Sequence, residues 1–145
     1  MGNSNSNDLI IKYEGFSAKA YKCPAGVWTL GIGSTKHPDG SPIKPSDTIT
    51  KEKAEAYLND YLNKNVRPKI ANLKLTRNQQ EALESLIYNI GWGAFSKSKC
   101  YAGIKNKDWE KVFNNWNWVK GNRKFLLGLA KRRAEELSLF FNDIK

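Results

Sequence analysis

The sequence has few of the residues from which disulfide frameworks and metal centres are built. It contains two cysteines, Cys23 and Cys100, and one histidine, His37, in a chain of 145 residues. These three residues are too few for a network of disulfides, and their spacing is not that of zinc ligands. We therefore predict that the protein uses no metal and no other cofactor. Whether the two cysteines pair is left open.

Long apolar segments are also missing. The first residues, MGNSNSND, have no apolar core of the kind that a signal peptide requires, and no apolar run approaches the length of a membrane span. We expect a protein made in the cytoplasm, with no stable anchoring in a membrane.

Positive charge is abundant. Lysine and arginine exceed acidic residues enough to give a formal net charge of +10, while 40% of the residues are hydrophobic, which is ordinary for a globular domain. A field of this sign favours polyanionic partners such as nucleic acid, an anionic membrane surface or an anionic cell-envelope polymer. Charge alone does not choose among them.

The hydrophobic patterns predict an α+β fold. Alternation in VWTLGIG, after a Pro and Gly turn at 23–26, predicts a β-hairpin, and a Pro-rich loop follows over 36–47. Thr76 and Gln79 form a capping box, and Gly91 ends the helix that it starts. Helices are predicted at 8–14 with Asp8 as cap, from 50 onwards, and at 76–90, 97–104, 108–116 and 126–142, with everything after residue 50 helical.

Glu14 is the first candidate for chemistry. It stands at the end of the first predicted helix, just before Gly15, where the helix dipole disfavours a negative charge and so favours a protonated carboxyl. In the strand that follows, the period of two places Trp28, Leu30 and Ile32 on the buried face. Thr29 and Gly31 fall on the other face, as a nearly bare strip of backbone that a ligand can approach.

The spacing of Glu14, Cys23 and Thr29, with eight and then five residues between them, resembles the catalytic signature of the phage-type lysozymes, the endolysins similar to phage T4 lysozyme. Other segments resemble this family in the same order. They are PAGVWTLGIGST for its small β-lobe, ITKEKAEAYLNDYL for its connecting helix, LTRNQQEALESLIYNIG for its central helix and GLAKRRAEELSLF for the tail motif of the lambdoid and P22-type subgroup.

The resemblance implies one lysozyme domain over 1–145, with the N-terminal helix, the β-lobe and the start of a connecting helix in 8–60 and a larger helical lobe in 61–145. It implies hydrolysis of the β-1,4 bond between N-acetylmuramic acid and N-acetylglucosamine in peptidoglycan. Glu14 would be the general acid and Thr29 would hold the attacking water. Cys23 departs from the usual Asp of the family and is a minority variant, and a mostly neutral thiol replaces that charge only if its surroundings make it a thiolate.

Three further residues are candidates for substrate binding. Gly31 lies on the bare strip, and Asn89 stands just before the end of the central helix. Arg132, beside Arg133, resembles arginines that pack towards the cleft in the family. One of the two arginines would pair with Glu14, or both would be ordinary partners of Glu135 and Glu136.

The family also implies partners. The substrate is peptidoglycan, a separate holin-type membrane protein would release the enzyme from the host cytoplasm to the wall or periplasm, and neither nucleic acid nor a second copy of the chain is expected. Two other functions stay open. A lytic transglycosylase also works with one carboxyl and would give anhydro-muramic products, and a basic module would bind wall polymer or nucleic acid without catalysis.

Overall fold

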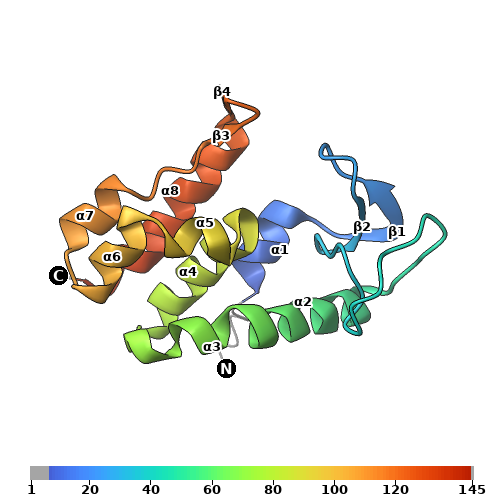
Figure 1. Ribbon diagram of the computed structural model, residues 1–145, viewed down its shortest axis with the longest axis horizontal. Coiled ribbons are helices and arrows are strands. Elements are labelled where there is room, and N and C mark those ends of the chain that lie inside the picture. Colours follow the sequence, from blue (N-terminus) through green and yellow to red (C-terminus); the bar gives the residue numbers. More distant parts are fainter. Residues whose placement is uncertain (1–6, 145) are drawn as a thin grey trace. The chain divides into compact units, whose positions relative to one another are not determined.

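The structure is a computed structural model that describes residues 7–144 (Figure 1). The chain forms two compact units, Met1–Asn65 and Val66–Lys145. The first combines helices with a small antiparallel sheet, and the second is mainly helical. The predicted α+β class is confirmed.

The first unit begins with the helix α1, Asp8–Glu14. The position before the helix is Asn7, so Asp8 lies in the first turn and is not the cap that the sequence predicted. Asn7 is fully buried and its amide donates to Asn59 Oδ1 at 3.0 Å. Gly15 ends the helix, as predicted, with a φ of 74° that favours glycine and a backbone N–H that donates to Ile11.

The predicted hairpin follows. Strand β1, Ser17–Lys22, pairs antiparallel with β2, Trp28–Gly31, and Tyr21 lies opposite Thr29. Leu30 is buried, as the alternation predicted, whereas Trp28 is only half-buried. The opposite face of β2 is not a bare strip, because Thr29 is also buried. On the same face, Gly31 lies close to Ala54 of the helix that follows.

Helix α2, Lys51–Asn65, closes the first unit, and its Ala54, Leu58 and Leu62 are fully buried. The loop before it is tied down by His37. The Nε2 atom of His37 lies 2.9 Å from Asp47 Oδ2, and its Nδ1 atom lies 2.9 Å from the hydroxyl of Tyr57 on α2. The histidine therefore serves the packing of this loop.

The second unit contains more elements than the sequence predicted. They are α3 Arg67–Ile70, the 3-10 turn η1 Ala71–Leu73, α4 Arg77–Ile90, α5 Trp92–Ser96, α6 Lys99–Lys105, α7 Trp109–Asn114, β3 Lys120–Gly121, β4 Lys124–Phe125 and α8 Leu127–Phe141. The expectation that everything after residue 50 is helical is wrong, because β3 and β4 form a hairpin. Asn122 and Arg123 both have positive φ there, the geometry of a tight two-residue turn.

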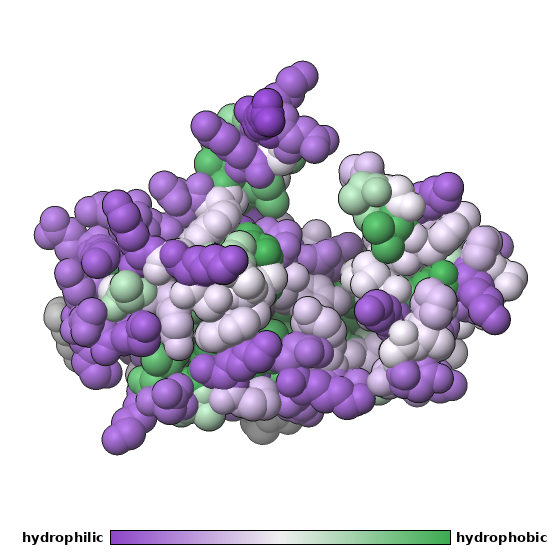
Figure 2. Space-filling view, viewed as in Figure 1, coloured by the Kyte–Doolittle hydropathy of each residue, from purple (hydrophilic) through white to green (hydrophobic). Residues whose placement is uncertain are grey.

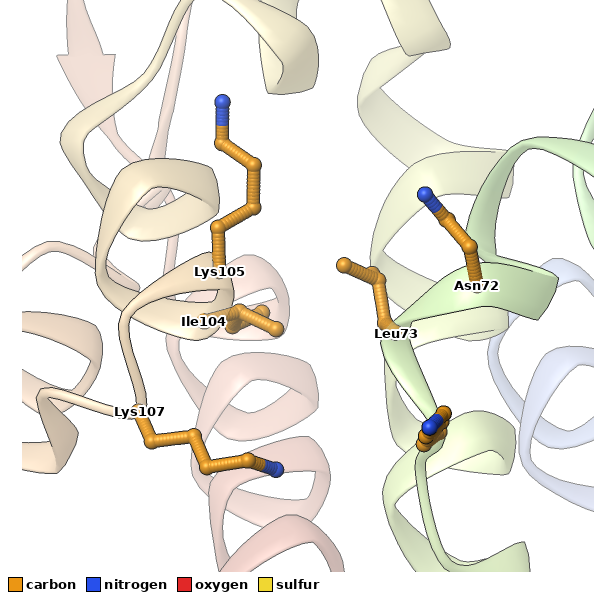
Figure 3. Close-up of a pocket in the computed structure, with 6 residues that line it drawn as sticks. Asn72, Leu73, Ile104, Lys105 and Lys107 are labelled. Carbon is orange, nitrogen blue, oxygen red and sulfur yellow. The ribbon is translucent and has the colours of Figure 1, made fainter.

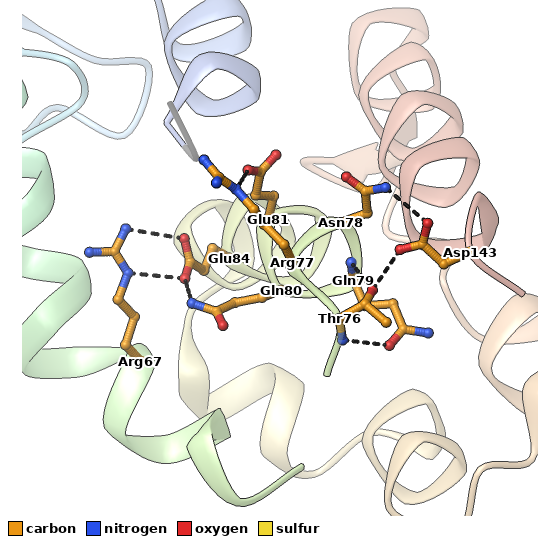
Figure 4. Close-up of polar contacts among 9 residues, drawn as sticks. All are labelled: Arg67, Thr76, Arg77, Asn78, Gln79, Gln80, Glu81, Glu84 and Asp143. Carbon is orange, nitrogen blue, oxygen red and sulfur yellow. Dashed lines mark hydrogen bonds and ion pairs between the residues drawn. The ribbon is translucent and has the colours of Figure 1, made fainter. Parts of the chain in front are cut away.

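The start of α4 is fixed as predicted by the capping box of Thr76 and Gln79 (Figure 4). The hydroxyl of Thr76 also donates to Asp143 Oδ2 at 2.8 Å, which attaches the end of the chain to this helix. Further along α4, the buried carboxylate of Glu84 pairs with Arg67 Nε at 3.0 Å. Polar side chains thus hold α4 to the segments before and after it.

Hydrophilic residues cover most of the face seen in Figure 2, with small apolar patches among them. Three large apolar side chains that are consecutive in the sequence are exposed at β4 and the start of α8. They are Phe125 at 60%, Leu126 at 45% and Leu127 at 61% exposure.

Candidate active site

The three residues predicted to act in catalysis belong to the first unit and to two connected elements. Glu14 is the last residue of α1 and is half-buried. Cys23 is half-buried where the hairpin turn begins, and Thr29, on β2, is only 3% exposed. The turn is closed by two backbone bonds, from Cys23 to Val27 at 3.0 Å and from Gly26 to Cys23 at 2.8 Å.

Tyr21 is the residue that links these three, and sequence reasoning did not single it out. Burial is the main cause that raises the pKa of its hydroxyl, followed by the negative charges of Glu14 and then Cys23. Both acidic groups therefore lie within electrostatic reach of one phenol. Tyr21 also pairs in register with Thr29 across the hairpin. The only signal in the sequence is its position two residues before Cys23 on a strand.

The surroundings of Cys23 favour its thiolate. Hydrogen bonds from the backbone of Val27, and then of Ala25, lower the pKa of the thiol below its usual range. The hydroxyl of Thr29 acts in the same direction. A thiolate can stand in for the negative charge of an aspartate, which a neutral thiol cannot.

The hydroxyl of Thr29 has two possible acceptors. It donates to the Val27 carbonyl at 3.0 Å, and it is also one of the groups that lower the pKa of the Cys23 thiol. A hydroxyl has one hydrogen and two lone pairs, so it donates to one of these groups at a time and still accepts from a water molecule. The group is thus suited to orient a water beside the thiol.

Gly31 approaches protein rather than open space. Its φ is 66°, and a Cβ atom at this position would lie 3.0 Å from the Cβ of Ala54 on α2. The glycine is therefore explained by close packing of β2 on α2. Its predicted contact with substrate stays a prediction, limited to the backbone.

The second unit buries a cluster of charged groups around Glu136, which is fully buried on α8. Its Oε1 atom lies 2.6 Å from Arg133 Nε and accepts from Trp116 Nε1 at 3.1 Å. Its Oε2 atom accepts from Ser85 at 2.5 Å and from Arg133 at 2.9 Å, and lies 3.4 Å from Arg132 Nε. We call these five residues, Ser85, Trp116, Arg132, Arg133 and Glu136, the Glu136 cluster.

The cluster changes the interpretation of the tail arginines. Arg132 and Arg133 are 3% and 2% exposed, so they are not the surface partners that one sequence alternative described. Arg132 donates to the hydroxyl and the carbonyl of Ser85, both at 3.2 Å. These bonds give Arg132 a packing role, and they lend no support to its predicted contact with substrate.

Asn89 is placed differently. Its side chain is exposed, and its Oδ1 atom accepts from Arg133 at 2.9 Å. The bond leaves the two amide hydrogens of Asn89 available at the surface. The side chain of Asn89 therefore has hydrogens that it can donate to a substrate, and its bond to Arg133 of the Glu136 cluster orients it. Its contact with substrate stays a prediction.

Comparison with known families identifies the chain. The family model described as phage lysozyme matches residues 11–136. The chain belongs to the phage lysozyme family. Lysozymes of this family are glycoside hydrolases, and the chain is a lysozyme of the phage type that hydrolyses peptidoglycan.

Similar proteins agree with this membership. An endolysin of Acyrthosiphon pisum secondary endosymbiont phage 1 is 39% identical over 139 residues, which cover 91% of this chain and 92% of the relative. The crystal structure of a P22 lysozyme mutant has a TM-score of 0.79 at 32% identity, covering 95% of this chain and 96% of that one. The muramidase domain of SpmX from Asticaccaulis excentricus has a TM-score of 0.79 at 31% identity, covering 94% and 95%.

Two further observations bear on this phage lysozyme. Within residues 7–144, no group of three or more His, Cys, Asp or Glu side chains is arranged to hold a metal ion. No helix in the same range is long and apolar enough to cross a membrane.

Proposed function

We propose that this phage lysozyme is a muramidase that cleaves the β-1,4 bond between N-acetylmuramic acid and N-acetylglucosamine, with Glu14 as its general acid. The observation that supports the proposal is that the charges of Glu14 and Cys23 both act on Tyr21, which pairs with Thr29 across the hairpin. Glycoside hydrolysis needs an acid, a negative charge and an oriented water. Glu14 can supply the acid, the thiolate of Cys23 the charge, and the hydroxyl of Thr29 can hold the water.

In this mechanism Glu14 donates its proton to the glycosidic oxygen as the bond from that oxygen to the sugar C1 atom breaks. The thiolate of Cys23 steadies the positive charge that develops on the sugar ring. A water held by Thr29 attacks C1, and its proton passes to the thiolate. The products are a reducing muramic end and a free hydroxyl on the glucosamine, with inversion at C1.

The partners follow from the same proposal. The enzyme is made in the host cytoplasm and acts as a monomer on the wall or in the periplasm. A holin-type membrane protein gives it access to that substrate. The high positive charge assists its attraction to the anionic wall.

Digestion of purified peptidoglycan tests the proposal. We expect wild type to release reducing muramic ends, and Glu14→Gln to lose activity by at least about a hundredfold, the size of a general-acid contribution. Cys23→Ala is expected to lose most of its activity, whereas Cys23→Asp retains it because a carboxylate restores the charge. The released sugars are identified by mass, and folding of each variant is checked by its melting temperature.

Each of the other outcomes has a definite meaning. Anhydro-muramic ends would identify a lytic transglycosylase. Full activity of Glu14→Gln would remove this residue from the reaction, and full activity of Cys23→Ala would make the thiol a bystander. Binding to the wall without any cleavage by wild type would favour a binding module.

A further inference from the structure

The second unit has a pocket that shares no residue with the candidate active site. Its volume is about 270 Å³, and its walls come from the segment after α3 and from the end of α6 (Figure 3). Leu73 and Ile104 point towards one another from the two walls, and Lys107 extends from one wall towards the other. The lining residues are Asn72, Leu73, Lys74, Ile104, Lys105 and Lys107.

The pocket is positively charged and lacks a counter-charge. Three of its six lining residues are lysines, and none is acidic. Within residues 7–144, no carboxylate forms an ion pair with Lys74, Lys105 or Lys107. The nearest acid along the chain, Asp108, accepts from the backbone of Lys111 at 3.2 Å as the cap of α7. Three lysines line one hollow, and their like charges repel one another unless an anion lies between them.

Aromatic rings hold two of these lysines without using their hydrogens. The Lys105 ammonium lies 4.4 Å from the centre of the Tyr101 ring, and that of Lys107 lies 5.9 Å from the centre of the Trp109 ring. A contact of this kind positions a cation through the face of the ring. The N–H donors of both lysines remain available to a ligand.

The backbone supplies an independent observation. Lys74 follows η1 with φ 54° and ψ 50°, and Lys107 follows the end of α6 with φ 53°. This left-handed conformation is the one in which helices usually end on glycine, and a residue with a side chain is strained there. Two separate segments thus carry a lysine where glycine would be easier, and both lysines line the same pocket.

We propose that this pocket binds a phosphate group carried on an anionic cell-envelope polymer. Lysines are suited to phosphate as mobile point charges with several donors. The volume falls just below the range of about 300–1,000 Å³ that is typical of small-molecule sites, which suits one phosphate with its neighbouring carbon chain. Leu73 and Ile104 then contact that chain. The site goes beyond the proposed cleavage, because it recognises a second component of the envelope and not the sugar bond.

The test uses the whole chain and a synthetic glycerol phosphate oligomer, without peptidoglycan, so that its outcome is independent of the muramidase proposal. In a nuclear magnetic resonance titration we expect the largest amide shifts at 72–74 and 104–107. The double variant Lys74→Gly/Lys107→Gly is expected to bind the oligomer at least tenfold more weakly. Its melting temperature should be equal to or above that of wild type, because glycine relieves the backbone.

The matched control is Lys97→Gln/Lys99→Gln, which removes the same charge from exposed positions of the same unit. It is expected to change the affinity by less than twofold. Equal losses in the two double variants would overturn the proposal in favour of non-specific attraction. Shifts of amides elsewhere in the unit, with none at the pocket, would overturn it as well.

Three other ligands distinguish the source of the phosphate. Glycerol alone is expected not to bind, and inorganic phosphate is expected to shift the same amides at higher concentration than the oligomer. Inorganic phosphate that binds as tightly as the oligomer would overturn the assignment to a polymer. A DNA duplex or a phosphatidylglycerol vesicle that occupies the pocket at lower phosphate concentration than the oligomer would overturn it in favour of that partner.

Discussion

The region around the hairpin of the first unit and the Glu136 cluster of the second both contain several polar side chains, but they bury them to different extents. In the cluster every charge is buried, and each carboxylate oxygen of Glu136 has at least two partners. In the first unit, Glu14 at the end of α1 and Cys23 at the start of the hairpin turn are only half-buried. The first arrangement fixes a structure, and the second leaves reactive groups within reach of solvent and ligand.

The difference shows that burial of charge and readiness for chemistry are separate properties. A buried charge that faces an opposite buried charge is costly to disturb and has little freedom to exchange protons or partners. A partly exposed group whose charge is tuned by a few backbone bonds can change partners during a reaction. The arginines of the tail motif belong to the first kind, and Cys23 belongs to the second.

The two cysteines give the sharpest form of this comparison. Cys100, on α6, is fully buried, and desolvation raises the pKa of its thiol to about 12, whereas the pKa of Cys23 is lowered. A lower thiol pKa means more thiolate at a given pH, and the thiolate is the species that reacts. At pH 7 we expect iodoacetamide to modify Cys23 more than about a thousandfold faster than Cys100, given an ordinary thiol pKa of about 8.5.

Mass spectrometry of peptides after timed alkylation measures both rates. The variants Cys23→Ser and Cys100→Ser provide one thiol each, and a short cysteine peptide gives the reference. The rate at Cys23 is expected to rise with pH around a midpoint below that of the peptide, since its pKa is lowered. Comparable rates at the two cysteines would remove the distinction between the two regions.

The Glu136 cluster is where we expect the largest loss of stability. Glu136→Gln removes the charge that Arg132 and Arg133 face in the interior, and breaking such a buried pair costs about 3–5 kcal/mol. Unfolding in urea, followed by tryptophan fluorescence, measures the change. Glu14→Gln, at the half-buried end of α1, is expected to change the free energy of unfolding by less than about 1 kcal/mol.

Glu110→Gln is the matched control for the cluster, because Glu110 is exposed in the first turn of α7. We expect it to cost less than about 1 kcal/mol, through its interaction with the helix dipole alone. Equal costs at Glu110 and Glu136 would mean that burial contributes nothing to the cluster.

Local chemistry made part of the fold predictable from sequence. Gly15 and Gly91 end their helices, and Thr76 caps α4, because caps depend on residues only a few positions apart. The hairpin of β3 and β4 was missed, since its turn uses Asn122 and Arg123 where glycine is the usual signal. The sequence therefore predicted caps and turns only where they use the residues that are usual for them.

The candidate site was likewise predictable from the sequence only in part. The spacing of Glu14, Cys23 and Thr29 was visible in the sequence through its resemblance to a family. The link through Tyr21 was not, because it depends on strand register and on charges from two elements. The burial of Arg132 was also beyond the sequence, since Ser85 and Trp116 reach the cluster from other helices and segments.

Asp143 offers a milder contrast with Glu136, as a carboxylate bound at the surface rather than in the core. Its side chain accepts from Thr76 at 2.8 Å and from Asn78 at 3.1 Å, and the Thr76 hydrogen bond is the main cause that lowers its pKa. A carboxyl with a lowered pKa adds stability above its unfolded value of about 4, and this stability is lost as pH falls through the folded pKa. We therefore expect Asp143→Asn to lower the melting temperature slightly at pH 7, with the difference from wild type shrinking below pH 4. A difference that stays constant down to pH 2 would assign the loss to packing and not to charge, and would place Asp143 with the structural residues of the core.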